Sequence, residues 1–134
     1  MKMSSKARYG LYVAVELAKR YSETDVVPVC VLAQSTGVTE KYLEQIIALM
    51  KKDKIVVSSR GALGGYKLAA SPQNITVGQV LRAVEDNLEI VDCLHKNCSA
   101  KCNCVSHNLW AKLYENINTY LDTISLEQLA KDNV

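Results

Sequence analysis

Four cysteines lie close together in the second half of the chain, and a histidine follows them. Cys93, Cys98, Cys102 and Cys104 fall within twelve positions, and His107 comes three residues after the last of them. Thiolates are soft ligands that suit iron–sulfur clusters or zinc, and an imidazole in place of one thiolate raises the reduction potential of a cluster. The spacing therefore predicts a metal site, with iron–sulfur chemistry favoured.

Two other interpretations of these thiols stay open. Zinc could be held in a tetrahedral site by Cys98, Cys102, Cys104 and His107, although their spacing departs from common zinc-finger patterns. The thiols could also form a metal-free redox switch. His95 is a weaker ligand candidate, more typical of an exposed loop residue. A secreted disulfide framework is not indicated, because its cysteines would be spread along the chain and would follow a signal peptide.

Length and charge favour a single globular domain with an anionic partner. The chain has 134 residues, of which 49% are hydrophobic and 22% charged, as in ordinary globular domains. Its net charge of +2 is unevenly divided. Residues 1–67 carry eleven basic and six acidic side chains, a net of +5, and residues 68–134 carry five and eight, a net of −3. A basic first half indicates a polyanion partner.

Several classes of protein are not indicated by the sequence. The start of the chain has no small-residue cleavage site, and no apolar run approaches the roughly 18 residues that span a bilayer. We therefore expect a cytoplasmic protein without a membrane partner. No phosphate-binding loop, nucleophile elbow or Ser-His-Asp set is visible, so we do not expect an enzyme.

The apolar pattern predicts three helices followed by a hairpin. A four-residue period covers positions 5–21, a short helix should run from Pro28 to Gly37 with Cys30 as an inert core residue, and Thr39 is a good N-cap for a third helix. A short helix, a glycine turn and a second helix match the helix-turn-helix motif. Residues 55–69 then read as two strands around a glycine-dense turn. The pattern predicts a mostly α fold, a winged helix-turn-helix with a two-stranded wing.

The second half is expected to hold a loop between helices. Thr76 and Gln79 have the spacing of a capping box for a fourth helix, and Ser125 starts a similar box for a last short one. Residues 87–105 show no sustained period and read as a loop. Ser106 could then cap a long helix to about position 123, whose apolar stripe exceeds what one small domain can cover.

Polar side chains at the start of the third helix could read DNA. Thr39, Lys41, Glu44 and Gln45 lie where helix-turn-helix proteins contact bases. Glu44 could accept a hydrogen bond from cytosine, and Gln45 could pair with adenine. Arg60, in the glycine turn of the hairpin, could enter a narrow minor groove. A solvated helix face is the alternative interpretation.

Three motifs together resemble the Rrf-type family of winged-helix transcription regulators. They are SKARYG at 5–10, YLEQ at 42–45 and RGALGGY at 60–66, in that order along the chain. The resemblance implies a homodimer built on the long C-terminal helix that binds palindromic or imperfectly palindromic double-stranded promoter DNA, with one wing per half-site. It maps Tyr42, whose ring could be partly core, and Glu44, Gln45 and Arg60 to DNA-reading positions. It maps Lys6 and Arg8 to backbone contacts.

The cysteine loop is similar to that of the iron–sulfur branch of this family, of the IscR and NsrR type, and most to the IscR type. This resemblance implies a [2Fe–2S] cluster, with [4Fe–4S] or zinc as alternatives, held by Cys93, Cys98, Cys104 and His107. The gap between the first two cysteines is one residue shorter than the usual pattern, and Cys102 is an additional thiol that could replace Cys98 or Cys104. A regulator of the CymR type lacks such a loop.

The resemblance divides the chain into a winged-helix domain at 1–86, a cluster-binding loop at 87–105, and a dimerisation helix with a short terminal helix at 106–134. It implies a regulator that senses cluster status, iron, redox state or nitric oxide. Cluster assembly in the loop could set the angle between the two DNA-reading units or the position of Glu44. A metal-binding scaffold without affinity for DNA is the alternative from a different class.

Overall fold

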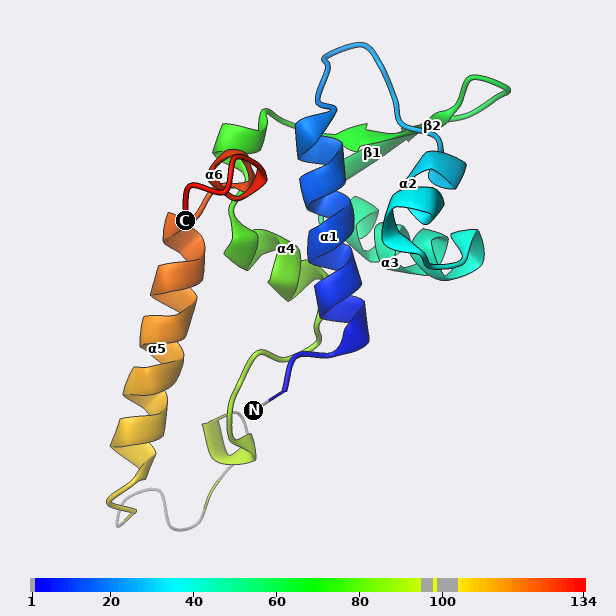
Figure 1. The fold of residues 1–134 in the computed structure, drawn as a ribbon. Helices are drawn as coiled ribbons and strands as arrows, with labels where there is room; N and C mark the ends of the chain where they lie inside the picture. The colour runs from blue at the N-terminus through cyan, green and yellow to red at the C-terminus, as the bar shows by residue number, and fades with distance from the viewer. Residues whose placement is uncertain (1, 95–97, 99–103) are drawn as a thin grey trace.

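The computed structural model describes residues 2–94, 98 and 104–134, and within them the chain forms six α-helices and one antiparallel sheet of two strands. The helices and strands, in order, are α1 (Ser5–Lys19), α2 (Val29–Thr36), α3 (Glu40–Lys52), β1 (Val56–Ser59), β2 (Gly65–Leu68), α4 (Val77–Val84), α5 (His107–Thr123) and α6 (Leu126–Ala130). α1 lies at the centre, with α2 and α3 on one side and α4 and α6 on the other (Figure 1). The predicted winged-helix architecture is confirmed.

Side-chain caps begin several helices where the sequence predicts them. The Thr39 hydroxyl accepts a hydrogen bond from the third backbone N–H of α3 at 3.3 Å. Thr76 and Gln79 form a complete capping box at the start of α4, and Ser125 and Gln128 form another at the start of α6. Each box satisfies backbone N–H groups that the helix itself leaves free, so these boundaries are determined locally.

The core lies between α1, α3, α4 and α6. Its largest fully buried side chains are Leu17, Leu32, Leu43, Ile46, Ile47, Met50, Leu68 and Leu126. Four residues of α3 are buried on one face of that helix, so the opposite face is held outward. We call α1 to α4 together with the wing the head.

Replacing Leu43 by alanine is expected to lower the free energy of unfolding by about 2–5 kcal/mol, because it leaves a cavity beneath α3. Leu43 is 0% exposed, whereas Leu63, in the wing turn, is 93% exposed. Denaturant unfolding of both leucine-to-alanine variants measures the difference. Equal losses would contradict this account of the core.

The expectation that Cys30 is a core residue is wrong, because its side chain is exposed on α2. The buried residue of this helix is Leu32. Two residues along a helix correspond to a rotation of about 200°, which turns Cys30 away from the core. Gly37, in the left-handed conformation (φ 70°), ends the helix after eight residues. A helix of this length has too few apolar positions for the sequence to indicate which face is buried.

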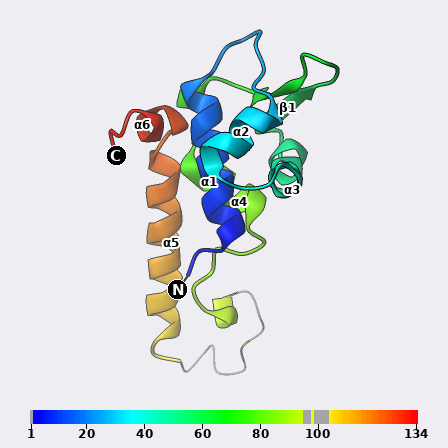
Figure 2. The same ribbon diagram turned by 45° about the vertical axis from the view of Figure 1, so that its right-hand side comes forward.

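α5 extends away from the head with an apolar stripe left uncovered. None of its 17 residues is buried, and Leu109 and Tyr120 are 60% and 58% exposed. Both ribbon views show the C-terminal end of α5 next to α6 and its N-terminal end far from the wing (Figures 1 and 2). The stripe is therefore only partly covered by the described part of this chain. In that same part, none of the helices has the length and apolar character needed to cross a membrane.

Candidate nucleic-acid interface and cysteine loop

The N-terminal half of α3 presents polar side chains to solvent. Leu43 and Ile46 face the core, and Lys41, Glu44 and Gln45 are exposed on the other side of the helix. Exposed donors and acceptors on one helix face are what base-edge recognition requires. The structure thus leaves these predicted positions accessible.

Tyr42 is half-buried and connects α3 to the start of α1. Its ring meets that of Tyr9 edge to face, with centroids 6.2 Å apart and an interplanar angle of 84°. The Arg8 guanidinium lies 5.9 Å from the centroid of the Tyr9 ring, a cation–π distance. Tyr9, which the sequence assigned only to an apolar helix face, therefore helps to hold both Arg8 and Tyr42. Lys6 lies about one helical turn before Tyr9 in α1 and is half-buried.

The wing is anchored at its base and free at its tip. Val27 and Tyr66 exchange two backbone hydrogen bonds, of 2.7 and 2.9 Å. A side chain at Gly65 would lie 2.4 Å from the Val27 carbonyl oxygen, so glycine permits this contact. Arg60 follows β1 and is exposed. The hairpin projects beyond α2 in Figure 1, which leaves Arg60 able to reach a duplex.

The base of the wing also interacts with the recognition helix α3. Burial, and then the negative charge of Glu44, raise the pKa of the Tyr66 hydroxyl above its ordinary value. α3 also contacts β1, the strand that pairs with β2, so the base of the wing packs beside this helix. The wing and the α3 residues that the sequence predicts to contact bases are therefore positioned together.

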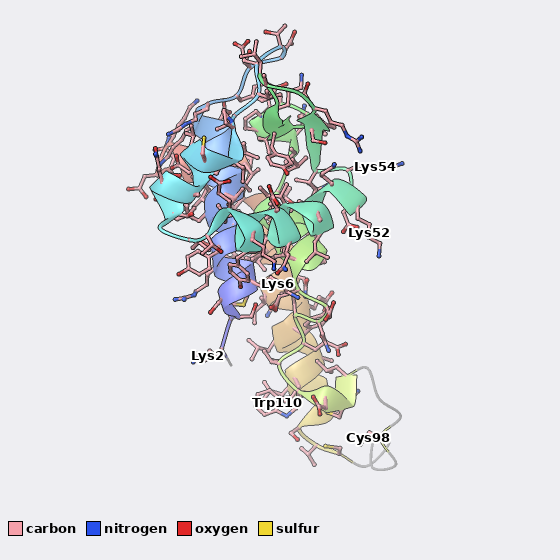
Figure 3. The ribbon with its side chains drawn as sticks, turned by 90° about the vertical axis from the view of Figure 1, so that its right-hand side faces the viewer. Lys2, Lys6, Lys52, Lys54, Cys98 and Trp110 are labelled. Atoms are coloured by element: carbon pink, nitrogen blue, oxygen red, sulfur yellow. The ribbon has the colours of Figure 1, made fainter. Side chains whose placement is uncertain are left out.

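Three further lysines lie near α3. Figure 3 shows Lys6 just below α3 and Lys52 and Lys54 at its C-terminal end. Both C-terminal lysines are exposed. From the sequence, these lysines are expected only to interact favourably with the negative end of the helix dipole. The structure also places them on the same side of the molecule as α3. They are additional candidates for phosphate contact.

The described cysteines of the loop lie at the other end of the molecule. Cys93 lies in a 3₁₀ turn (Asp92–Leu94), and Cys98 and Cys104 are partly exposed. Figure 3 places Cys98 and Trp110 at the end remote from α3 and the wing. Cys102 and His95, which the sequence also proposes, lie outside the described residues. Predicted DNA contacts and predicted metal ligands are thus separated by much of the molecule.

Cys104 has a thiol that is set up to ionise. Ser106 begins α5 but makes no side-chain capping bond, and its Oγ lies 3.3 Å from the Cys104 sulfur. The hydroxyl of Ser106 and the backbone N–H groups of Ser106 and His107 lower the pKa of the Cys104 thiol below its ordinary value. Thiolate is the form that binds metal. The side chain of Ser106, which the sequence predicts as a helix cap, therefore interacts with Cys104 and not with the backbone of α5.

Replacing Ser106 by alanine is expected to raise the pKa of the Cys104 thiol toward its ordinary value, because the largest stabilising hydrogen bond to the thiolate is removed. The pH dependence of alkylation by iodoacetamide measures it in metal-free protein with Cys104 as the single cysteine. An unchanged pH profile would contradict the assigned hydrogen bond.

His107 provides a second observation at the start of α5. Its Nδ1 atom is buried and has no hydrogen-bond partner among the described residues. Buried polar atoms normally have partners, and an imidazole nitrogen with a free lone pair is a metal ligand. No group of three or more Cys, His, Asp or Glu side chains in residues 2–94, 98 and 104–134 forms a metal-holding set. The donor chemistry of thiolates with an orphan imidazole nitrogen nevertheless fits an iron–sulfur cluster.

Comparison with known proteins identifies the family. The model of the Rrf2 family, described as iron-dependent transcriptional regulators, matches residues 3–132. The chain belongs to the Rrf2 family. It is 36% identical to the HTH-type transcriptional regulator IscR of Aliivibrio salmonicida, over 99% of this chain and 79% of that protein.

Solved structures of Rrf2-like regulators have the same fold. The T. potens IscR structure superposes with a TM-score of 0.78 and 35% identity, over 100% of this chain and 89% of that one. CymR, the global cysteine regulator of B. subtilis, gives a TM-score of 0.79 and 35% identity, over 98% and 97%. This Rrf2 protein is therefore a DNA-binding transcription regulator rather than an enzyme, which confirms two expectations from the sequence.

Proposed function

We propose that this Rrf2 protein is a homodimeric regulator whose cysteine loop binds a [2Fe–2S] cluster and whose affinity for promoter DNA depends on that cluster. The observation that carries the proposal is the buried His107 Nδ1, which has no hydrogen-bond partner among the described residues. The His107 backbone N–H donates to the Cys104 carbonyl at 3.2 Å, so this imidazole lies close to a cysteine whose thiol has a lowered pKa. The IscR relatives and the family description support iron as the metal.

The proposed ligands are Cys93, Cys98, Cys104 and His107, with Cys102 as a possible replacement for Cys98 or Cys104. When bound, a cluster supplies a charge and a redox centre that respond to iron supply, oxidants and nitric oxide. The chain's own contribution is to favour the thiolate form of Cys104 by lowering the pKa of its thiol and to present the His107 nitrogen at the start of α5. The state of the loop would thereby act on the dimer helix.

The proposed dimer interface is the apolar stripe of α5. Exposed apolar patches of this kind mark interaction sites. The residues that form the stripe are Leu109, Trp110, Leu113, Ile117, Tyr120 and Leu121, all of them half-buried or exposed. Pairing of two such helices would bring two heads to one duplex. In each head, Arg60 and the residues at the start of α3, Thr39 included, would contact bases, and Lys6 and Arg8 would contact the backbone.

An anaerobic purification tests the cofactor and the dimer together. The proposal predicts a coloured protein that contains iron and acid-labile sulfide and has the mass of a dimer in solution. A colourless protein that contains zinc would overturn the cluster, and a monomeric protein would overturn the dimer. Neither result would affect the assignment to the Rrf2 family.

A metal-free thiol regulator is the second candidate, and one observation favours it. The fold is as similar to CymR as to IscR, and the Cys104 thiol has a lowered pKa, which increases its reactivity. This candidate predicts that anaerobic protein contains no metal and that oxidants alter DNA affinity through the loop cysteines. The same metal analysis distinguishes the two.

A further inference from the structure

The C-terminal end of α5 is attached to the start of α4 through the backbone. The Val77 N–H donates to the Ile124 carbonyl at 2.9 Å, and the Leu126 N–H donates to the Ile75 carbonyl at 2.8 Å. Ile124 and Leu126 are buried against the head. These two hydrogen bonds fix the position of the C-terminal end of α5. They do not by themselves determine the direction of the α5 axis relative to the head.

A second attachment lies farther along α5. Arg82 of α4 donates from Nη1 to the Asn118 side-chain oxygen at 3.0 Å, and its Nη2 forms an ion pair with Asp122. Asn118 and Asp122 are one helical turn apart and so lie on the same face of α5. The planar guanidinium holds both with fixed geometry. We call these three residues the α4–α5 clamp.

A glycine leaves room for the clamp. A Cβ atom at Gly78 would lie 2.1 Å from the Asp122 carboxylate oxygen. Glycine is disfavoured inside a helix, yet it occupies the second position of α4. The Thr76 hydroxyl lies 3.4 Å from the same oxygen. The start of α4 is therefore shaped to receive Asp122.

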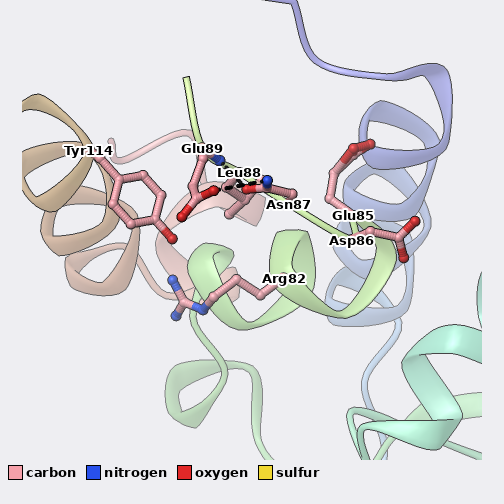
Figure 4. Close-up of a pocket in the computed structure, with 7 residues that line it drawn as sticks. All are labelled: Arg82, Glu85, Asp86, Asn87, Leu88, Glu89 and Tyr114. Atoms are coloured by element: carbon pink, nitrogen blue, oxygen red, sulfur yellow. Dashed lines mark hydrogen bonds between the residues drawn. The ribbon is translucent and has the colours of Figure 1, made fainter. Parts of the chain in front are cut away.

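Beyond the clamp, α5 is loosely supported. A hollow of about 430 Å³ separates α4, residues 85–89 and α5. Figure 4 shows Arg82 extending from α4 toward α5 at the edge of this hollow, on the side of Tyr114. No residue of α5 is fully buried. Of its apolar side chains, Leu121 near the C-terminal end packs against the core, so apolar packing among the described residues restrains this helix mainly at that end. Two points of attachment, the backbone pair and the clamp, define that direction.

We propose that the α4–α5 clamp sets the distance between the two heads of the dimer and so selects the separation of DNA half-sites. Arg82, Asn118 and Asp122 act as positioning residues, remote from the bases. In a dimer, the separation of half-sites is a geometric consequence of how each head is mounted. The inference rests on the proposed dimer through α5 and adds a determinant of DNA specificity outside α3 and the wing.

The test uses an inverted-repeat duplex that the wild-type protein selects from a random library. Versions are made with the centre lengthened or shortened by one, two or three base pairs, and affinities are measured at fixed salt. The wild-type protein should prefer one separation. Asp122→Asn and Gly78→Ala should lower the ratio of best to second-best affinity by about two- to fivefold, the range that an exposed ion pair can supply.

The two variants act by different routes, which makes the test specific. Asp122→Asn removes the charge, whereas Gly78→Ala leaves all charges in place and obstructs Asp122. Both clamp side chains in the ion pair are partly exposed, at 39% and 46%, so folding should survive, and thermal unfolding checks this. Lys131→Gln, which breaks the exposed pair with Glu127 at the C-terminal end of α6, is the matched control and should keep the wild-type ratio.

The outcomes separate this inference from the proposed function. If the variants are dimeric and keep the full wild-type preference for one half-site separation, the role of the clamp is overturned and the proposed function is not. A wild-type protein that is monomeric, or that shows no preferred separation, would overturn the proposed dimer and the clamp with it. A flattened preference in both variants, with the control unchanged, supports the inference.

Discussion

Arg60→Ala should weaken binding to a selected promoter duplex by about 1–3 kcal/mol, roughly 5- to 160-fold in affinity. The residue is exposed beyond β1, on a wing whose base is fixed by the paired Val27 and Tyr66. An arginine held this way can enter a narrow minor groove with strong negative potential. Because the wing backbone is unaffected, the free energy of unfolding should stay within experimental error.

Lys112→Ala is the matched control for Arg60→Ala. It also removes one positive charge, but from an exposed position on α5, remote from α3 and the wing. Titrations at several salt concentrations should show a large loss for Arg60→Ala and little change for Lys112→Ala. Equal losses would mean that only net charge matters and that the wing does not reach the DNA.

His107→Ala should reduce the iron retained after anaerobic purification by about tenfold or more, since losing even a partner of a metal ligand costs that much. The buried Nδ1 atom has no other described partner, so a ligand role accounts for it. Cys104→Ser should have a similar effect, because hydrogen bonds from Ser106 and His107 lower the pKa of the Cys104 thiol and so favour its metal-binding form. Iron, sulfide and the visible absorption spectrum measure both.

Cys30→Ser is the control for the ligand variants, because Cys30 is exposed on α2, outside the loop. It should retain full iron content. A His107→Ala protein with wild-type iron and spectrum would exclude the histidine as a ligand. Single Cys93, Cys98 and Cys102 variants complete the series and decide which thiols are used.

Local signals in the sequence predicted most of the head. Caps such as Thr39 and the boxes at Thr76 and Ser125 depend on residues within one turn, so they are readable without the fold. The hairpin was predicted from strand propensity on either side of a glycine-dense turn. The exposure of the α5 stripe was predicted because the stripe has more apolar residues than one small domain can cover. These features follow from chemistry between near neighbours in the chain.

Contacts between distant residues could not be predicted in this way. Arg82 and Asp122 are separated by 40 positions, and neither has a distinctive local pattern. Cys30 was assigned to the wrong face because eight residues of α2 carry too little periodicity to distinguish the faces. Ser106 looked like an ordinary cap, but the fold directs its hydroxyl to Cys104.

The central claim is that the state of the cysteine loop controls DNA affinity. The most direct test is to measure the affinity of anaerobic cluster-loaded protein and of metal-free protein for the same set of selected duplexes, at one salt concentration. The account predicts a difference of about fivefold or more on at least one duplex, as expected for a coupling of 1–3 kcal/mol between two sites. Equal affinities on every duplex that the protein binds would contradict it.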